Sequence, residues 1–264
     1  MSTVRRAILP AAGRGMRMRP FSLVVPKELA PVGSRPAIHF VLDEAAGAGI
    51  EEVIVVVAPD KPLLRHYLEL AQAEGAWPGL RLCFTTQEEP TGLADAIAIC
   101  AHLTGNDPFA LLLPDNLPLA PEYRLDVLLE LWAERGRHVV GVLEIDSAWS
   151  GLYGNSGRID HRTIAPGVLA IDRLHDKEPG RLHIPAGARV VRACGRYVFG
   201  SEVFARIEAS RAGAGETSEV PAVQLLAREG ALLGALLPSP LFDVGHPQGL
   251  LAASAFLAGR PVDA

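Results

Sequence analysis

Cysteine and long apolar runs are both scarce in this sequence. The chain of 264 residues contains three cysteines, Cys83, Cys100 and Cys194. Their odd number and the lack of metal-ligand spacing argue against structural zinc and for reduced thiols. The longest apolar runs, such as residues 53–58 and 109–113, have the length of strands and are too short to cross a bilayer. We therefore expect a cytoplasmic protein that does not bind membranes.

Lysine is much rarer than arginine. Of the 25 basic residues, only Lys27, Lys61 and Lys177 are lysines. Lysine carries a compact point charge and arginine a planar fork, so the two are not equivalent at a phosphate. Lys27 and Lys177 stand in motifs described below and are candidates for function. Lys61 stands in no such motif, and we interpret it as a chance lysine.

The basic residues are concentrated near the beginning of the chain. Residues 1–35 contain seven basic side chains and one acidic one, whereas the whole chain has a net charge of −5. This distribution argues against nucleic-acid binding and indicates one local site for an anion. Scattered solubilising arginines are the alternative. Pro10 and Gly13 interrupt the first apolar run, so the segment lacks the pattern of a signal peptide.

The hydrophobic pattern predicts alternating strands and helices. No linker divides the chain, so we expect one α/β domain over residues 1–264, with a doubly wound, mostly parallel sheet. Strands are predicted at residues 6–12, 52–58, 81–87, 109–113, 139–145, 167–174, 192–199 and 231–237. Helices are predicted at residues 36–47, 61–74, 92–103, 121–136, 201–209, 218–228 and 247–257. Residues 151–167 are rich in Gly, Ser, Asn and Arg and are predicted to form an irregular excursion over the sheet.

A glycine turn, Gly13-Arg14-Gly15, follows the first predicted strand. Backbone N–H groups in such a turn can surround a phosphate. The dinucleotide-binding pattern would require glycine where Met18 stands, and no GK[ST] sequence follows as in a Walker loop. The turn therefore predicts a phosphate loop of another kind.

A series of motifs continues from this turn in order along nearly the whole chain. The first is AAGRGMRMRPFSLVVPKELAP at residues 11–31. The others are RPAIHFVLDEAAGAGIEEVIVVV (35–57), TQEEPTGLADAI (86–97), FALLLPDN (109–116), YGNSG (153–157), DKEP (176–179), GRYVF (195–199), GE (215–216) and FDVGHPQGLLAA (242–253). The series resembles the sugar-1-phosphate nucleotidyltransferases, most closely the bacterial UTP–glucose-1-phosphate uridylyltransferases. The resemblance implies their Rossmann-like nucleotide-diphospho-sugar transferase fold.

Several positions depart from the family pattern. Met16 stands where the family has threonine, and Ser22-Leu23 replaces a Thr-Lys pair. The acidic position after the GE motif falls near Pro221, and Glu178 is an extra residue inside the DKEP stretch. These departures bear on the identity of the substrate and on the rate, and they leave the predicted fold unchanged.

The resemblance implies transfer of a nucleotidyl group from a nucleoside triphosphate to a sugar 1-phosphate, with release of pyrophosphate. The attacking phosphate oxygen is already ionised at neutral pH, so no general base is needed. Asp115 and Asp243 match the family's metal carboxylates and are predicted to hold Mg²⁺. The sequence without the resemblance favours a turn or helix-capping aspartate at Asp115, and the resemblance favours the metal ligand. His246 is interpreted as a loop histidine.

The resemblance also assigns roles to the cations. Arg17 is predicted to contact the triphosphate, Lys27 to neutralise phosphates near the transferred group, and Lys177 to meet the sugar phosphate. Arg14 and Arg19 would assist, unless they are ordinary surface arginines.

The remaining site residues fall into a nucleotide set and a sugar set. Gln87 is predicted to read the base, since an amide donates and accepts hydrogen bonds as the paired edge of a pyrimidine requires. The other nucleotide-binding residues are predicted to be Ala11, Ala12, Gly13, Arg14, Gly15 and Gly92. The sugar-phosphate residues are predicted to be Tyr153, Gly154, Asp176, Lys177 and Glu216.

Together these features predict a Mg²⁺-dependent enzyme that makes UDP-glucose from UTP and glucose 1-phosphate, as a homo-oligomer of two or four chains. The AAG opening and the lack of a C-terminal β-helix extension favour the uridylyl type over the thymidylyl and adenylyl types. One alternative is a nucleotidyltransferase that uses dTTP or an unusual sugar or cyclitol phosphate. Another is a catalytically weak homologue that binds nucleotide sugars as a sensor.

Overall fold

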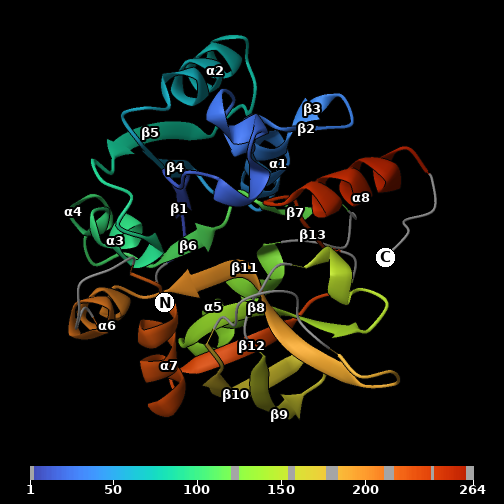
Figure 1. Ribbon diagram of the computed structural model, residues 1–264. Helices are drawn as coiled ribbons and strands as arrows, with labels where there is room; N and C mark the ends of the chain where they lie inside the picture. The colour runs from blue at the N-terminus through green and yellow to red at the C-terminus, as the bar shows by residue number, and fades with distance from the viewer. Residues whose placement is uncertain are drawn as a thin grey trace.

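One nine-stranded sheet forms the centre of the molecule (Figure 1). The computed structural model describes residues 3–119, 125–153, 158–176, 184–210, 217–238 and 241–259. The strands lie in the order β5-β4-β1-β6-β11-β8-β12-β10-β9. Their bounds are β1 Arg6–Pro10, β4 Glu52–Val57, β5 Arg81–Thr86, β6 Phe109–Leu112, β8 His138–Asp146, β9 Ile159–Ala165, β10 Val168–Leu174, β11 Arg189–Phe199 and β12 Leu232–Leu236.

Most strands of this sheet share one direction. β1 pairs in parallel with β4 and β6, β4 with β5, and β8 with β12. β11 runs antiparallel between β6 and β8, and β10 runs antiparallel between β12 and β9. Only β10 and β11 are therefore reversed among these strands, and the predicted mostly parallel sheet is confirmed.

Helices cover both faces of the sheet. Neighbouring side chains of β1 point to opposite faces, so that Leu9 packs with α1, α2 and α5, and Ile8 packs with α3, α6 and α7. The helices are α1 Ala37–Gly47, α2 Pro62–Ala73, α3 Leu93–Ala98, α4 Ala101–Thr104, α5 Asp126–Arg135, α6 Glu202–Ser210, α7 Val220–Arg228 and α8 Pro247–Leu257. This arrangement confirms the doubly wound fold. Within the described residues, none of the helices combines the length and the apolar character needed to span a membrane.

Short elements lie at the edge of the sheet where the parallel strands end. Three 3₁₀ turns, Met16–Met18, Phe21–Leu23 and Lys27–Leu29, follow β1, and a fourth is Ser150–Leu152. Two small sheets complete this edge: β2 (Pro31–Val32) pairs with β3 (Arg35–Pro36), and β7 (Asn116–Pro118) pairs with β13 (Leu241–Asp243).

Two sequence predictions of secondary structure are wrong. The predicted helix 92–103 is two helices, α3 and α4, because Cys100 N–H bonds to the carbonyl of Ile97 and tightens the turn between them. Residues 151–167 do not form only an irregular excursion, because Ile159–Ala165 is strand β9. β9 is an edge strand in which only Ile159 is buried, so its side chains lack the alternating apolar pattern that marks a strand.

Candidate active site

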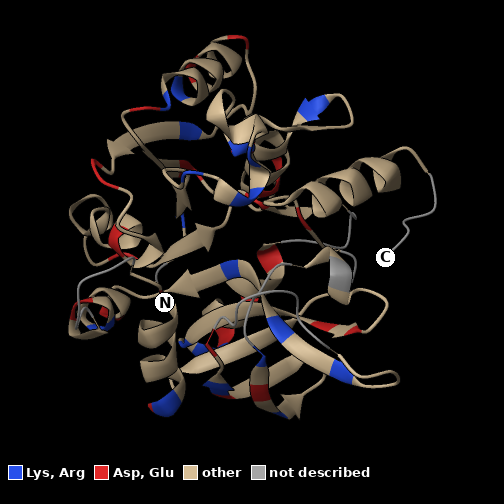
Figure 2. Ribbon diagram, in the orientation of Figure 1, with Lys and Arg blue, Asp and Glu red and all other residues tan. Residues whose placement is uncertain are grey.

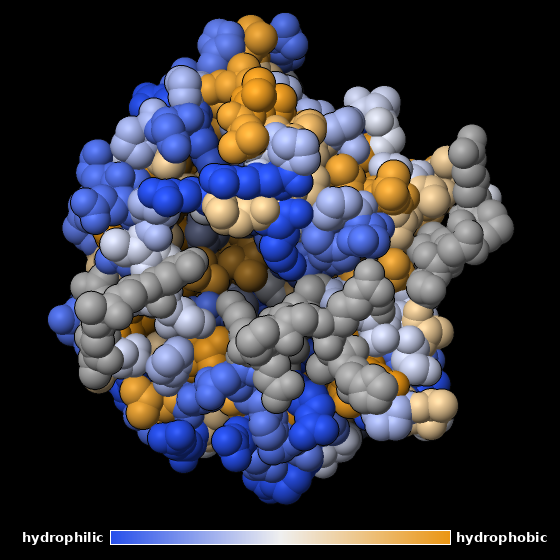
Figure 3. All heavy atoms as spheres, viewed as in Figure 1, coloured by the Kyte–Doolittle hydropathy of each residue, from blue (hydrophilic) through white to orange (hydrophobic). Residues whose placement is uncertain are grey.

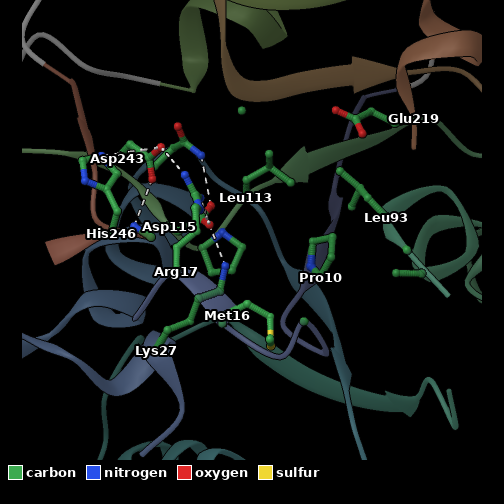
Figure 4. A pocket seen from close by; sticks show the side chains of 18 of the residues that line it. Pro10, Met16, Arg17, Lys27, Leu93, Leu113, Asp115, Glu219, Asp243 and His246 are labelled. Carbon is green, nitrogen blue, oxygen red and sulfur yellow. Dashed lines mark hydrogen bonds and ion pairs between the residues drawn. The ribbon is translucent and has the colours of Figure 1, made fainter. Parts of the chain in front are cut away.

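A cavity of about 1260 Å³ opens at the carboxyl ends of the parallel strands (Figures 3 and 4). The loops after β1, β5 and β6 line one part of it. The middle of β11, residues 245–248 and several single residues, among them Tyr153 and Glu219, line the rest. This edge is where open α/β sheets bind ligands. The volume exceeds the roughly 300–1,000 Å³ of a pocket for one small molecule. The cavity thus has room for two small substrates.

Lys27 and Asp115 form an ion pair on the cavity wall. Lys27 Nζ donates to Asp115 Oδ2 over 2.6 Å, and the two side chains are only 16% and 15% exposed. Burial raises the pKa of Asp115, but the charges of Lys27 and Arg17 outweigh this effect and hold the pKa at about 2. Burial lowers the pKa of Lys27, and Asp115 and Glu28 more than reverse that change. Both partners are therefore charged at neutral pH.

Asp243 lies beside this pair (Figure 4). Arg17 joins the two carboxylates, since its Nη1 donates to Asp243 Oδ2 over 3.3 Å and its Nη2 lies 3.8 Å from Asp115 Oδ2. The small β7–β13 sheet fixes their spacing. Asn116 stands opposite Asp243 in its register, and Val244 N–H donates to the carbonyl of Asp115 over 2.8 Å. The predicted metal ligands are thus brought together by backbone pairing.

Gly245 keeps the space between these charged groups open. A Cβ atom at this position would lie 2.7 Å from Arg17 Nη2, 2.8 Å from Asp115 Oδ2 and 3.0 Å from Asp243 Oδ1. Two carboxylates that converge on one open position fit Mg²⁺, which takes oxygen ligands and keeps waters and substrate phosphates as the others. No group of three or more potential ligand side chains exists among the described residues. The protein would thus supply two carboxylates to the ion.

His246 has a definite structural role. Its Nδ1 accepts a hydrogen bond from Gly249 N–H at the start of α8, and its Nε2 lies 3.2 Å from the carbonyl oxygen of Leu152. The ring also lies 4.0 Å from Asp243. The predicted loop histidine therefore caps α8 and connects it to the 3₁₀ turn before Tyr153.

The glycine turn after β1 lies on the cavity wall. Its three residues, Gly13, Arg14 and Gly15, line the cavity, and so does Ala12 before them. Ser22, which replaces the threonine of the family's Thr-Lys pair, donates its hydroxyl to the carbonyl of Gly15 over 2.7 Å. Ala11 is buried behind the wall, and Arg19 is exposed and is not among the lining residues.

Gln87 lies at the end of β5 with its amide group turned into its own loop. Its Nε2 lies 3.0 Å from the carbonyl of Gly92 and within hydrogen-bond distance of Thr91 and Asp95. The donor half of the amide is therefore engaged within the loop. That Gln87 reads the base stays a prediction.

Gly92 is fixed by a close approach of two backbones. It has φ +117° and pairs with Thr217, whose backbone a Cβ atom at position 92 would strike. Only glycine fits this bridge, which connects the Gln87 loop to the segment before α7.

Of the predicted sugar-phosphate residues, the structure describes only Tyr153 and Asp176. Tyr153 is buried and lines the cavity. Asp176 accepts a hydrogen bond from Gln224 over 3.2 Å and is not among the lining residues. The predicted residues Gly154, Lys177 and Glu216 lie outside the described residues.

The family model for nucleotidyl transferases matches residues 6–260 of the chain. The chain belongs to the nucleotidyl transferase family. Two relatives of this nucleotidyltransferase come from Bacillus subtilis (strain 168). This chain is 29% identical over 272 residues to the UTP–glucose-1-phosphate uridylyltransferase YngB, and the match covers 95% of this chain and 88% of the relative. This chain is also 29% identical to a UTP–glucose-1-phosphate uridylyltransferase of the same strain, and that match covers 96% of this chain and 91% of the relative.

Solved structures share the fold of the nucleotidyltransferase. A UDP-glucose pyrophosphorylase complexed with UDP-glucose has a TM-score of 0.83 and 24% identity to this chain, and the match covers 97% of this chain and 100% of that one. A UTP-bound UGPase from Acinetobacter baumannii has a TM-score of 0.78 and 24% identity, over 96% and 93% of the two chains. At these identities the likeness shows the fold.

The interpretation of Lys61 as a chance lysine is wrong. The side chain is buried, and its Nζ contacts both carboxylate oxygens of Glu28 at 3.0 and 3.2 Å and donates to the carbonyl of Ala11 over 2.8 Å. Burial lowers the pKa of Lys61, and Glu28 only partly opposes this change. Lys61 thus joins the end of β1 to the segment that carries Lys27 in this nucleotidyltransferase. The scarcity of lysine was a signal for this role.

Sequence reasoning also missed two charged residues of the cavity wall. Glu219 is 4% exposed and stands two residues before Pro221, near which the family's acidic position falls. Arg192 is 3% exposed and stands in β11. The family's acidic position near Pro221 could have indicated Glu219. Arg192 is a single arginine in a predicted strand, and nothing in the sequence marks it as a cavity residue.

Proposed function

We propose that this nucleotidyltransferase transfers a uridylyl group from UTP to glucose 1-phosphate and releases UDP-glucose and pyrophosphate. The observation that carries the proposal is the cluster of Arg17, Lys27, Asp115 and Asp243 at the sheet edge. Such a cluster suits two polyanionic substrates that must meet in line. The names of the relatives support UTP and glucose 1-phosphate as the pair.

Asp115 and Asp243 would hold Mg²⁺ in this proposal. When bound, the ion would neutralise phosphate charge. Lys27 and Arg17 would then be released in part from the two carboxylates and would face the phosphates. Their charges would favour the approach of a second anion and the departure of pyrophosphate.

No protein base is required for the transfer. The phosphate of the acceptor is largely ionised at neutral pH, since its second pKa lies near 6. The histidine on the cavity wall, His246, is occupied by Gly249 N–H on one ring nitrogen and faces the carbonyl of Leu152 with the other. This ring therefore serves to hold α8 and the Tyr153 segment in place.

The amide oxygen of Gln87, Oε1, supports a choice among bases. Uracil and thymine present an N3–H donor, whereas N3 of cytosine carries no proton. With Nε2 bonded to the Gly92 loop, Oε1 can accept from uracil or thymine. The proposal therefore favours UTP, with dTTP as the closest competitor, because one methyl group changes affinity by only about 1–3 kcal/mol.

The test is a matrix of triphosphates against sugar 1-phosphates. UTP, dTTP, CTP, ATP and GTP are each combined with glucose, galactose and mannose 1-phosphate, with Mg²⁺ or with EDTA. Nucleotide sugar and pyrophosphate are both measured. We expect the most product from UTP and glucose 1-phosphate, and none with EDTA. No product in any combination would indicate a binding protein, and a preference for ATP or GTP would contradict the assignment of Gln87.

We also propose that the chain forms a homo-oligomer of two or four copies in solution. Size-exclusion chromatography with light scattering measures the number of copies directly. A monomer at micromolar concentration would contradict this expectation and would leave the proposed reaction untouched.

A further inference from the structure

The cavity wall contains a buried guanidinium, two nitrogens of which have no hydrogen-bond partner among the described residues. Arg192 is 3% exposed and lines the cavity. Its Nε and Nη1 atoms are buried, and neither has a hydrogen-bond partner in the part of the chain that the structure describes. Such groups are normally paired, because an unpaired buried charge costs far more free energy than a paired one.

Two other arginines of the same strand show how this protein satisfies such groups. Arg196 is buried as deeply, and its Nε donates to Glu44 over 2.8 Å. Its other nitrogens donate to the carbonyls of Leu113, Gly195 and Asn116. Arg189 is exposed and pairs with Glu144. The arginines on either side of Arg192 in β11 thus have hydrogen-bond or ion-pair partners, most of them on neighbouring elements.

The surroundings of Arg192 provide only partial compensation. Its guanidinium carbon lies 4.3 Å from the centre of the Tyr153 ring, a cation–π contact that holds the group in one orientation. Among the described carboxylates, none forms an ion pair with it, although the charge of Asp243 acts on it from across the wall. Within the described parts of the chain, the guanidinium is therefore held in position without an ion-pair partner.

The strand order gives the place of this group in the cavity. Asp115 follows β6, and the glycine turn and Gln87 lie on the side of β1 and β5. β11 lies on the other side of β6, and because it is antiparallel, Arg192 extends past the Arg196–Leu112 pair toward the cavity. Arg192 is thus separated from the nucleotide-binding turn by the Asp115 position. On the proposed function, that half of the cavity receives the acceptor.

We propose that Arg192 binds an anionic oxygen of the acceptor sugar phosphate. This inference rests on the proposed function, since that function assigns the β11 half to the acceptor. The oxygen belongs either to the 1-phosphate itself or to a second anionic group on the sugar, such as the carboxylate of a uronic acid. Arginine forms strong charge-assisted hydrogen bonds with both groups.

The experiment measures ligand affinity by titration calorimetry for the wild type and for Arg192→Gln. Arg189→Gln, from the same strand, is the matched control. The ligands are glucose 1-phosphate, glucuronic acid 1-phosphate and UTP. The sugar phosphates are titrated with and without the non-reacting analogue α,β-methylene-UTP. We expect Arg192→Gln to weaken sugar-phosphate binding about ten- to hundredfold and to leave UTP binding within about twofold. Arg189→Gln should bind all three ligands as the wild type does.

The two sugar phosphates distinguish the source of the oxygen. An equal loss for both supports contact with the 1-phosphate, and a loss confined to glucuronic acid 1-phosphate supports contact with a carboxylate. Unchanged binding of both, or an equal loss for UTP, overturns the proposal. If Arg192→Gln does not fold, Arg192→Lys keeps the charge, and it should lose affinity for the sugar phosphates alone.

The outcome is separable from that of the proposed function. Sugar phosphates that bind through Arg192 without any nucleotide sugar being formed would support the anion site and contradict the reaction. UDP-glucose formed by an Arg192→Gln variant with unchanged acceptor affinity would support the reaction and overturn the anion site.

Discussion

Lys61 donates a hydrogen bond of 2.8 Å to the carbonyl oxygen of Ala11, fifty positions earlier in the chain. The same ammonium group is paired with Glu28, which is 1% exposed and adjacent to Lys27. One buried cation thus connects the turn after β1 to the segment that places Lys27 beside Asp115. The end of β1 and the segment that carries Lys27 are thus held together by a residue on a third element, at the start of α2.

The first prediction concerns this connection. Lys61→Met should lower the free energy of unfolding by about 3–5 kcal/mol, because it leaves Glu28 buried without its cation. The double variant Lys61→Met/Glu28→Gln should be less destabilised than the sum of the two single changes. Urea unfolding of the four proteins measures this coupling. Arg65→Met, which removes an exposed partner of Glu69 on α2, is the control and should change stability by less than about 1 kcal/mol. Additive effects would contradict the assigned connection.

The second prediction concerns the two carboxylates. Asp115→Asn and Asp243→Asn should each lower turnover by about a hundredfold or more while the protein remains folded, since each removes charge from the proposed ion site. Steady-state rates over a range of Mg²⁺ concentrations test this, with circular dichroism to verify folding. Near wild-type turnover at limiting Mg²⁺ for either variant would rule out its role as a ligand.

The third prediction concerns acid stability. The pKa of Asp115 is about 2 in the folded protein, below the value of about 3.9 for an unperturbed aspartate. A lowered pKa stabilises the fold above pH 4, and this contribution, about 2 kcal/mol, is lost as the pH falls toward 2. The difference in unfolding free energy between the wild type and Asp115→Asn should therefore shrink between pH 5 and pH 2. A difference that does not change with pH would show that the ion pair with Lys27 does not form in solution.

The fourth prediction concerns base selection. Gln87→Ala removes the acceptor Oε1 and also the amide that supports the Gly92 loop. The KM for UTP should rise about tenfold, and the preference for UTP over ATP should narrow. Gln72→Ala is the control, because Gln72 bonds to the carbonyl of Leu80 away from the cavity. An equal loss of activity with UTP and ATP would show that Gln87 supports the loop without reading the base.

The fifth prediction concerns the thiols. Burial raises the pKa of Cys100 to about 12 and that of Cys194 to about 11. At pH 8 both are therefore almost entirely protonated and unreactive. Ellman's reagent should react at most with Cys83 in the native protein, and with all three cysteines in guanidinium chloride. Rapid reaction of more than one thiol in the native state would contradict the burial of the other two.

The predictions that succeeded are those that depend on local pattern. The continuous apolar run of β4, Glu52–Val57, is buried along its whole length, as a strand covered on both faces requires. α8 begins and ends at Pro247 and Leu257 as predicted, because Pro favours the first turn of a helix. The motifs around Asp115 and Asp243 gave the two carboxylates that the β7–β13 sheet brings together.

Three of the failures share one physical cause. The roles of Lys61, Arg192 and strand β9 depend on contacts with residues distant in sequence. Lys61 is paired with Glu28 and Ala11, and Arg192 lines the cavity and packs on the ring of Tyr153. The side chains of β9 between Ile159 and Ala165 are exposed at the edge of the sheet, so its pairing with β10 produces no alternating apolar pattern in the sequence. Such relationships depend on tertiary contacts and not on spacing.

The pairing of β7 with β13 also has a consequence for the time course of folding. Asp115 and Asp243 meet only when strands from the middle and the late part of the chain have paired, and Arg17 joins them from 226 positions before Asp243. Contacts between such distant segments form late, because long loops must close first. During refolding, the sheet of β1, β4 and β5 can bury its apolar side chains before any pair of carboxylates exists. Recovery of turnover would then lag behind recovery of secondary structure, and enzyme activity would report completion of the fold.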